Sequence, residues 1–218
     1  LQNRKFFFKI AKKIAKNRFG TFPKKAHVLA RDHKGLSNAY TKLIETIVAP
    51  HMRDVVRKHH RIHSDENINT ENVKKGNAKE VHEDGGFEVL YQFPPTIRCH
   101  CATDPPKSSG RCHSDAQYGH QPGEINFWMP LSHQICASNT LWRESVGGKG
   151  DWKPVLLEVG QILRWHGTSC RHFTIPNDSG KTRVSIDFRC VVKGMYDATW
   201  KLPGVQYQHE MRSCVIPS

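Results

Sequence analysis

Three features are missing from this sequence. No apolar run approaches the ~20 residues that a membrane-spanning helix needs, so no transmembrane segment is expected. No CxxC pair is present, which argues against a four-cysteine zinc site, because such sites usually contain these pairs. No RNA- or DNA-binding motif and no internal repeat is visible.

Acidic residues are scarce in the first third of the chain. Residues 1–80 carry 19 Lys and Arg against 7 Asp and Glu, whereas residues 81–218 carry 14 against 13. Such a basic segment is compatible with an arm that binds nucleic acid or an anionic membrane surface. Without a recognition motif, a solvated helical face is the commoner outcome, and we expect no nucleic-acid partner.

The cysteine pattern indicates a reduced protein. The seven cysteines are an odd number, and several suit core positions as small apolar groups. We therefore expect an intracellular, cytoplasmic protein, although disulfides after secretion stay open. The basic start lacks the continuous apolar core of a secretory signal, while a remnant of organelle targeting also stays open. The first residue is Leu1 rather than Met, which leaves open that the sequence is a fragment.

Helical patterns occupy the N-terminal part. Residues 1–18 are typical of a short basic amphipathic helix, and the apolar spacing over residues 36–62 predicts a second helix that Pro50 breaks or kinks. Residues 63–86 are polar and read as a loop or linker. Residues 1–85 thus form a basic helical region and linker, and they resemble nothing familiar.

From residue 86 onward the sequence pattern is typical of β-strands. Short segments rich in β-branched and aromatic residues alternate with Gly, Pro, Asn and Asp turns. The segments are GFEVLYQFPPTIRCHCA, EINFWMPLS, NTLWRES, PVLLEVGQILRWHG, RHFTIPN and TRVSIDFRCVV. We predict a mainly β fold, a sandwich or barrel over residues 86–218, joined to the N-terminal helices in a single compact domain.

The stretch CHSDAQYGHQPGEINFW, residues 112–128, contains metal-ligand side chains just before an apolar strand. His113 and Asp115 would point the same way if they lie on one strand. His172 follows 59 residues after His113 and supplies a third ligand. Two imidazoles and one carboxylate on one face of an iron leave the opposite positions open. His120 and Glu124 are rival ligands, but nearby Gly and Pro place His120 in a turn.

An arginine and a serine complete the pattern. Arg183 and Ser185 would project from one face of a strand, about 7 Å apart. An Arg fork beside a hydroxyl can hold a carboxylate with two charge-assisted hydrogen bonds and one further bond. Each motif is common by chance, but their order and strand-like surroundings together indicate a metal site beside a carboxylate site.

With these motifs, residues 86–192 resemble the Fe(II)/2-oxoglutarate-dependent oxygenases of the broad phytanoyl-CoA dioxygenase-like type. They resemble more closely the oxygenase-like proteins of streptomycin-type biosynthetic clusters. The matching stretches are HSDAQYGHQPGEINFWMPLS, NTLWRES and WHGTSCRHFTIPNDSGKTRVSIDFR. The resemblance implies a double-stranded β-helix (jelly-roll, cupin-like) core and a role in specialised metabolism.

The resemblance also implies roles for individual residues. Iron would be held by His113, Asp115 and His172. Arg183 would pair with the distal carboxylate of 2-oxoglutarate, helped by Ser185.

Two further side chains are implied near the co-substrate. Trp128 occupies the place of a co-substrate contact in related oxygenases, and Asn126 shares its strand face. A core aromatic is the alternative for Trp128. The implied reaction consumes O2 and 2-oxoglutarate, releases succinate and CO2, and oxidises a C–H bond, by default to an alcohol.

Strand geometry offers four candidate substrate contacts: Arg98, Trp142, Glu144 and Arg189. His120, in its turn, is a fifth candidate, which could cover the site or contact substrate. Arg189 shares a strand face with Arg183, so it would suit an anionic group on a small-molecule substrate. A structural ion pair with Asp187 or another acid is its alternative role.

Two other functions stay open. A cupin-type metal enzyme without 2-oxoglutarate would usually add a third histidine and would not need Arg183 and Ser185. A non-catalytic jelly-roll binding protein would leave the ordered motifs unexplained. The oligomeric state cannot be read from the sequence.

Overall fold

The computed structural model describes residues 33–66, 86–133, 135–201 and 210–217. Its helical elements are α3 (Lys34–Leu43), the π-helical turn η1 (Ile44–Val48), α4 (Ala49–Glu66), and the 3-10 turns η3 (Asp115–Tyr118) and η4 (Lys193–Met195). Its strands are β1 (Phe87–Phe93), β2 (Thr96–His100), β3 (Ile125–Pro130), β4 (Trp142–Arg143), β5 (Lys153–Pro154), β6 (Leu163–Trp165), β7 (His172–Phe173), β8 (Arg183–Val192) and β9 (Glu210–Ile216). The helix predicted over residues 1–18 lies outside the described residues, as does most of the predicted loop 63–86.

The predicted second helix is present, but Pro50 does not end it. α3, η1 and α4 follow one another without a gap from Lys34 to Glu66. Pro50 is the second residue of α4, directly after the π-helical turn. Proline has no N–H for the helical ladder, and a π-turn interrupts that ladder anyway, so the helix continues past the proline. None of the helices in the described ranges is long and apolar enough to cross a bilayer.

Two antiparallel sheets form the body of the protein. The larger sheet has the strand order β6-β3-β8-β1-β9, with β2 also paired to β8, and the smaller sheet has the order β5-β4-β7. All pairings between these strands are antiparallel. The expected mainly β class with a preceding helix is confirmed, and the paired sheets have the arrangement of a jelly-roll core.

The longest strand, β8, separates the core from a polar face. Its sequence RVSIDFRCVV alternates, so Val184, Ile186, Phe188 and Cys190 point to one side, and all are fully buried. On that side the helix supplies Tyr40, whose ring centroid lies 5.1 Å from that of Phe188.

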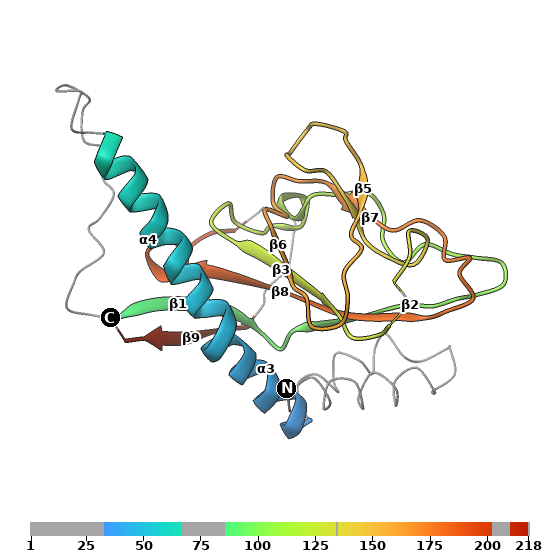
Figure 1. The fold of residues 1–218 in the computed structure, drawn as a ribbon, viewed down its shortest axis with the longest axis horizontal. Coiled ribbons are helices and arrows are strands. Elements are labelled where there is room, and N and C mark those ends of the chain that lie inside the picture. Colours follow the sequence, from blue (N-terminus) through green and yellow to red (C-terminus); the bar gives the residue numbers. More distant parts are fainter. Residues whose placement is uncertain (1–32, 67–85, 134, 202–209, 218) are drawn as a thin grey trace.

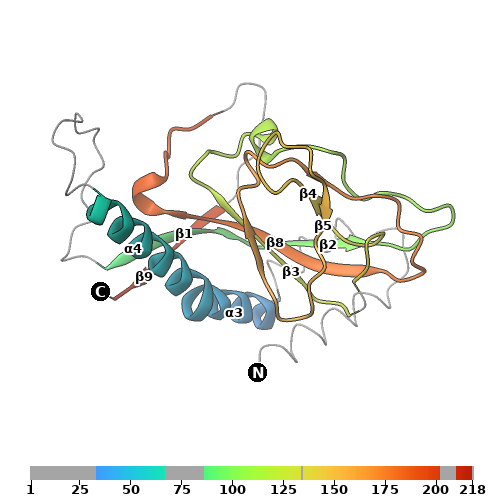
Figure 2. The same cartoon turned by 45° about the horizontal axis from the view of Figure 1, so that its top comes forward.

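The two faces of the large sheet have different neighbours. In Figures 1 and 2 the helix α3–α4 runs along one side, and β4, β5 and β7 lie on the other. Helix and sheet share one apolar cluster, which includes Leu36, Ile44 and Met52 of the helix with Val89 and Phe127 of the sheet. The face that looks toward the smaller sheet carries the polar side chains of β8.

The strand predictions hold in type but not in every boundary. PVLLEVGQILRWHG was predicted as one strand-rich segment, yet only the short β5 edge and β6 form from it. β9 was not predicted at all, although it pairs with all of β1. Its sequence, EMRSCVI, is half charged or polar, which suits an edge strand but gives a weak periodicity.

Candidate metal centre

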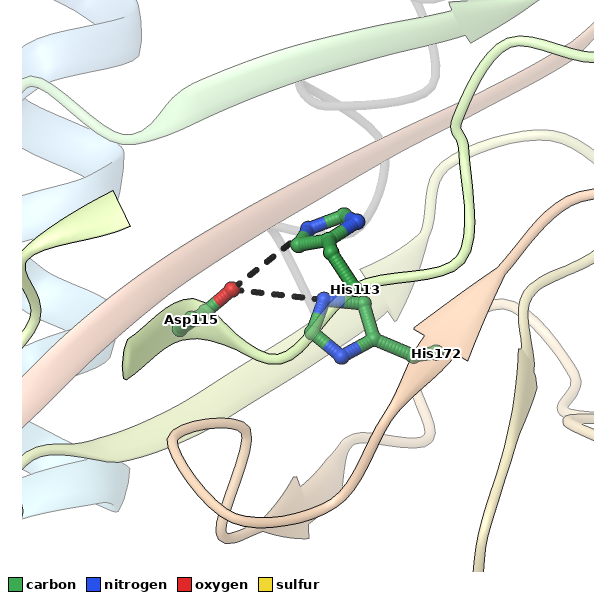
Figure 3. A group of neighbouring side chains, drawn as sticks. All are labelled: His113, Asp115 and His172. Atoms are coloured by element: carbon green, nitrogen blue, oxygen red, sulfur yellow. Dashed lines mark ion pairs between the residues drawn. The ribbon is translucent and has the colours of Figure 1, made fainter. Parts of the chain in front are cut away.

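Three side chains converge between the two sheets. His113, Asp115 and His172 each offer one ligand atom, and these atoms lie within 4.8 Å of one another. The Oδ1 atom of Asp115 is 3.3 Å from Nε2 of His172 and 3.7 Å from Nε2 of His113 (Figure 3). Asp115 and His172 are buried, and His113 is partly exposed. The set of two imidazoles and one carboxylate matches the facial triad of non-haem iron sites.

Both imidazoles are held with Nε2 toward the centre of the cluster. Nδ1 of His113 is 2.6 Å from the carbonyl oxygen of Arg111, and Nδ1 of His172 is 3.1 Å from that of Cys170. A carbonyl oxygen only accepts, so each Nδ1 donates, and Nε2 is left as the nitrogen whose lone pair can bind a metal. Three lone-pair donors that face one another fit a cation between them, and the donor chemistry therefore suits a divalent metal.

The H-x-D pair does not lie on one strand, so that geometric prediction is wrong. His113 forms an isolated bridge with His172, with N–H···O distances of 3.1 and 2.8 Å in the two directions. Asp115 instead begins the 3-10 turn η3, which ends at Gly119 with a φ of 87°. The Ser114 N–H donates to the Gln117 side chain at 3.3 Å, which favours the turn.

The second carboxylate oxygen of Asp115 is fully occupied by donors. Oδ2 accepts from Nδ2 of Asn126 at 2.6 Å and from Nε and Nη2 of Arg189 at 2.9 and 2.7 Å. Burial raises the pKa of the Asp115 carboxyl, but the contacts with His172 and Arg189 outweigh it and hold this pKa well below its ordinary value. Asp115 is therefore a carboxylate at any physiological pH.

Arg183 is a buried cation that lines one pocket together with His113 and His172. Its side chain is 1% exposed, and Nε donates to the carbonyl oxygen of Asn139 at 2.9 Å. Nη1 donates to the hydroxyl of Ser185, and the guanidinium lies 5.6 Å from the ring centroid of Trp128. Burial lowers its pKa to about 10, with a smaller effect of the nearby Arg98 charge. Within the described residues no carboxylate lies in ion-pair distance of Arg183.

Most of the predicted site residues share one pocket. It is lined by both histidines of the triad and by Asn126, Trp128 and Arg183. Ser185 lies behind Arg183, and apolar side chains such as Trp165 and Phe173 complete the wall. The pocket thus places the two histidines and the buried cation around one space.

The two other arginines in the pocket each form an ion pair with a carboxylate of the protein. Arg98 forms a two-bond pair with Asp187 at 2.6 and 3.3 Å, and about half of its side chain is exposed. Arg189 holds Asp115, as described, and lies 3.8 Å from Asp187. The sequence left open whether Arg189 binds substrate or a carboxylate of the protein, and the structure places it on the Asp115 carboxylate.

Three candidate substrate contacts, His120, Trp142 and Glu144, do not line this pocket. His120 is buried, and its Nδ1 lies 2.6 Å from the Glu124 carboxylate, which also accounts for that rival ligand. Trp142 donates from Nε1 to the carbonyl oxygen of Ala137 at 2.7 Å.

Glu144 is completely enclosed by donors. It accepts from the backbone N–H groups of Gly148, Gly150 and Arg171 at 3.3, 2.9 and 2.9 Å. The Arg171 guanidinium adds contacts of 3.2 and 2.6 Å, and these hydrogen bonds lower the pKa of Glu144 to about 2. Because Arg171 precedes His172, Glu144 anchors the segment that carries this ligand.

Sequence reasoning missed several groups that shape the site. Thr174 Oγ1 accepts from the N–H groups of Ser109 and Gly110, both at 2.8 Å, and so fixes part of the pocket wall. Gly167 accepts from the N–H of Asp115 at 2.8 Å and donates to Asn126 at 3.1 Å. The pairing of Thr174 with residues over sixty positions away has no local sequence signal.

Comparison with known proteins gives one curated relative and several distant structures. The chain is 34% identical over 109 residues to the streptomycin biosynthesis protein StrG of Streptomyces griseus. This match covers 50% of each chain, so the chain spans about half the length of that relative in the alignment. No family model matches the sequence.

The structural neighbours are remote. A non-haem monooxygenase, ThoJ in complex with nickel, has a TM-score of 0.38 at 21% identity, over 48% of this chain and 45% of that one. The non-haem alpha-ketoglutarate-dependent epimerase SnoN from nogalamycin biosynthesis has a TM-score of 0.38 at 14% identity, over 60% and 61%. A cupin protein from Bacteroides fragilis has a TM-score of 0.27 at 15% identity, over 64% and 100%.

Proposed function

We propose that this protein is a mononuclear non-haem iron oxygenase that uses 2-oxoglutarate and O2 to oxidise a C–H bond of a small molecule, with hydroxylation as the default outcome. One observation carries the proposal: a buried Arg183 without a carboxylate partner in the described chain shares a pocket with a His-Asp-His cluster. A buried charge is costly unless it is paired, so an unpaired guanidinium indicates a site for an anionic ligand.

The residues present fit the implied groups. His113, Asp115 and His172 would hold Fe(II), and the planar fork of Arg183 suits the distal carboxylate of a 2-oxo diacid. The Ser185 hydroxyl, already bonded to Arg183, keeps the fork oriented. When bound, the iron and its co-substrate supply the oxidising power.

The chain's own contribution is orientation and exclusion of water. Backbone carbonyls fix both imidazole tautomers, and Trp128 covers the guanidinium with an apolar face. Asp187 neutralises Arg98, which also lines the pocket. The half-exposed side chain of Arg98 can reach a polar or anionic group of a small-molecule substrate. The likeness to StrG supports a role in specialised metabolism.

The first test is an anaerobic titration of the protein with Fe(II) and 2-oxoglutarate, followed by the visible charge-transfer band of the chelate. We expect a band that needs both additions and is absent from a His172→Ala variant. A folded wild-type protein that shows no band would contradict the proposal. Iron binding without the band would favour the cupin-type alternative that does not use 2-oxoglutarate.

A further inference from the structure

The two carboxylate oxygens of Asp115 have different surroundings. Oδ1 faces the two histidine Nε2 atoms, whereas Oδ2 points away from them into three N–H donors of Asn126 and Arg189. An oxygen that accepts three hydrogen bonds, two of them from a guanidinium, has no lone pair left for a metal. This asymmetry is built into the protein before any metal binds.

The orientation of the Asn126 amide is fixed by the loop that follows β6. Its Oδ1 accepts the Gly167 N–H at 3.1 Å, so its Nδ2 must face Asp115, where it donates at 2.6 Å. The same glycine accepts the Asp115 N–H at 2.8 Å. A Cβ at position 167 would lie 2.5 Å from the Asn126 amide, so only glycine allows this contact.

The Arg189 guanidinium is fixed from the opposite side. Its Nη1 donates to Oε1 of Gln92 at 3.1 Å. The Gln92 amide donates in turn to the carbonyl oxygen of Pro94 at 3.2 Å and to the Thr96 hydroxyl at 3.0 Å. Gln92 is 1% exposed and Arg189 is 4% exposed, so water does not compete for these bonds. Two independent chains of hydrogen bonds thus end on one carboxylate oxygen.

We propose that Asn126 and Arg189 are positioning residues that make Asp115 a one-oxygen ligand and so keep coordination positions free for the co-substrate and O2. The proposal rests on the metal site of the proposed function. Without these donors, Oδ2 could turn toward the metal, and the carboxylate would then take two positions instead of one. Asn126 and Arg189 line the pocket, but their polar atoms serve the metal ligand rather than a substrate.

The test is a titration of the metal-free protein with Co(II), followed by its ligand-field absorption, for the wild type and the variants Asn126→Ala and Arg189→Met. Arg189→Lys keeps the charge and loses the fork, so it covers the case in which Arg189→Met does not fold. Lys193→Met is the control, because Lys193 pairs with Glu88 at 2.7 Å on the surface and does not line the pocket.

We expect the Asn126 and Arg189 variants to bind Co(II) about 10–100-fold more weakly, the usual cost of removing such a support. Their ligand-field bands should also weaken, because a two-oxygen carboxylate raises the coordination number, while the Lys193 control keeps the wild-type spectrum. Folded variants with wild-type affinity and spectrum would overturn the proposal and leave the proposed function intact. A wild-type protein that binds neither Co(II) nor Fe(II) would overturn both.

Discussion

Arg183 and Arg189 offer a matched pair for mutation. They lie on the same face of β8 and are 1% and 4% exposed, yet within the described ranges only Arg189 of the two contacts a carboxylate. If Arg183 is held ready for an anionic ligand, its burial must cost stability in the ligand-free protein. We therefore predict that Arg183→Met costs much less stability than Arg189→Met.

The magnitudes follow from the contacts. Arg183→Met removes a buried charge that has no ion-pair partner in the described residues, which is favourable, but it also removes the hydrogen bonds that the guanidinium donates to the Asn139 carbonyl and the Ser185 hydroxyl, at a cost of about 1–3 kcal/mol. The two effects have similar size, so the free energy of unfolding should stay within about 2 kcal/mol of the wild type. Arg189→Met leaves the buried Asp115 carboxylate without its main counter-charge, which costs about 3–5 kcal/mol.

Urea unfolding of the metal-free proteins measures this difference, provided that the slope of free energy against urea is unchanged. Equal losses of stability in the two variants would refute the reasoning, because Arg183 would then be as well compensated as Arg189.

The same Arg183→Met protein should fail in ligand binding. Two charge-assisted hydrogen bonds contribute about 1.5–3 kcal/mol each, so the affinity of the iron-loaded protein for 2-oxoglutarate should fall about 10²–10⁴-fold. A 2-oxo acid without the distal carboxylate should bind equally to variant and wild type. Equal weakening of both ligands would show that Arg183 does not contact the distal carboxylate.

Three further predictions concern other parts of the structure. Glu144 has a folded-state pKa of about 2, below its ordinary 4.5, so its contribution to folding stability is present above about pH 4.5 and is lost as the pH falls toward 2. The free energy of unfolding of Glu144→Gln should therefore fall less steeply over this pH range than that of the wild type. Gly167→Ala should displace Asn126 and weaken Co(II) binding, whereas Gly110→Ala, whose Cβ would lie 3.8 Å from its nearest contact, should not. Tyr40→Phe should lose about 1–3 kcal/mol in urea unfolding, because its hydroxyl donates at 2.7 Å to a buried strand carbonyl; an unchanged midpoint would contradict that.

The grouping of His113, Asp115 and His172 could be predicted from the sequence, since it was inferred from residue types and their order alone. Arg183 and Ser185 could be placed on one face because β8 keeps a strict period of two. The H-x-D pair broke the same rule: Ser114 and Gly119 favour a tight turn, and local turn chemistry outweighs the strand period there.

The partners of the charged side chains could not be read in the same way. Asp115 and Arg189 are 74 positions apart, and Arg98 and Asp187 are 89 apart. The register of β8 against β2 and β3 decides which arginine pairs with which carboxylate. Periodicity within one strand carries no information about that register. The same reason hides Thr174, which accepts from the N–H groups of Ser109 and Gly110, and Gln92, which accepts from the Arg189 side chain 97 positions away.

The alternation of β8 also bears on how the chain finds its register during folding. A slip of one residue would turn Arg183, Asp187 and Arg189 toward the apolar helix Lys34–Glu66 and expose Ile186 and Phe188 to the pocket. Each wrong register would place several charges against the apolar core at once. The same side chains that form the site therefore also destabilise misregistered sheets. Substitutions that make this face apolar would then remove the chemistry and, with it, the penalty that rejects wrong pairings.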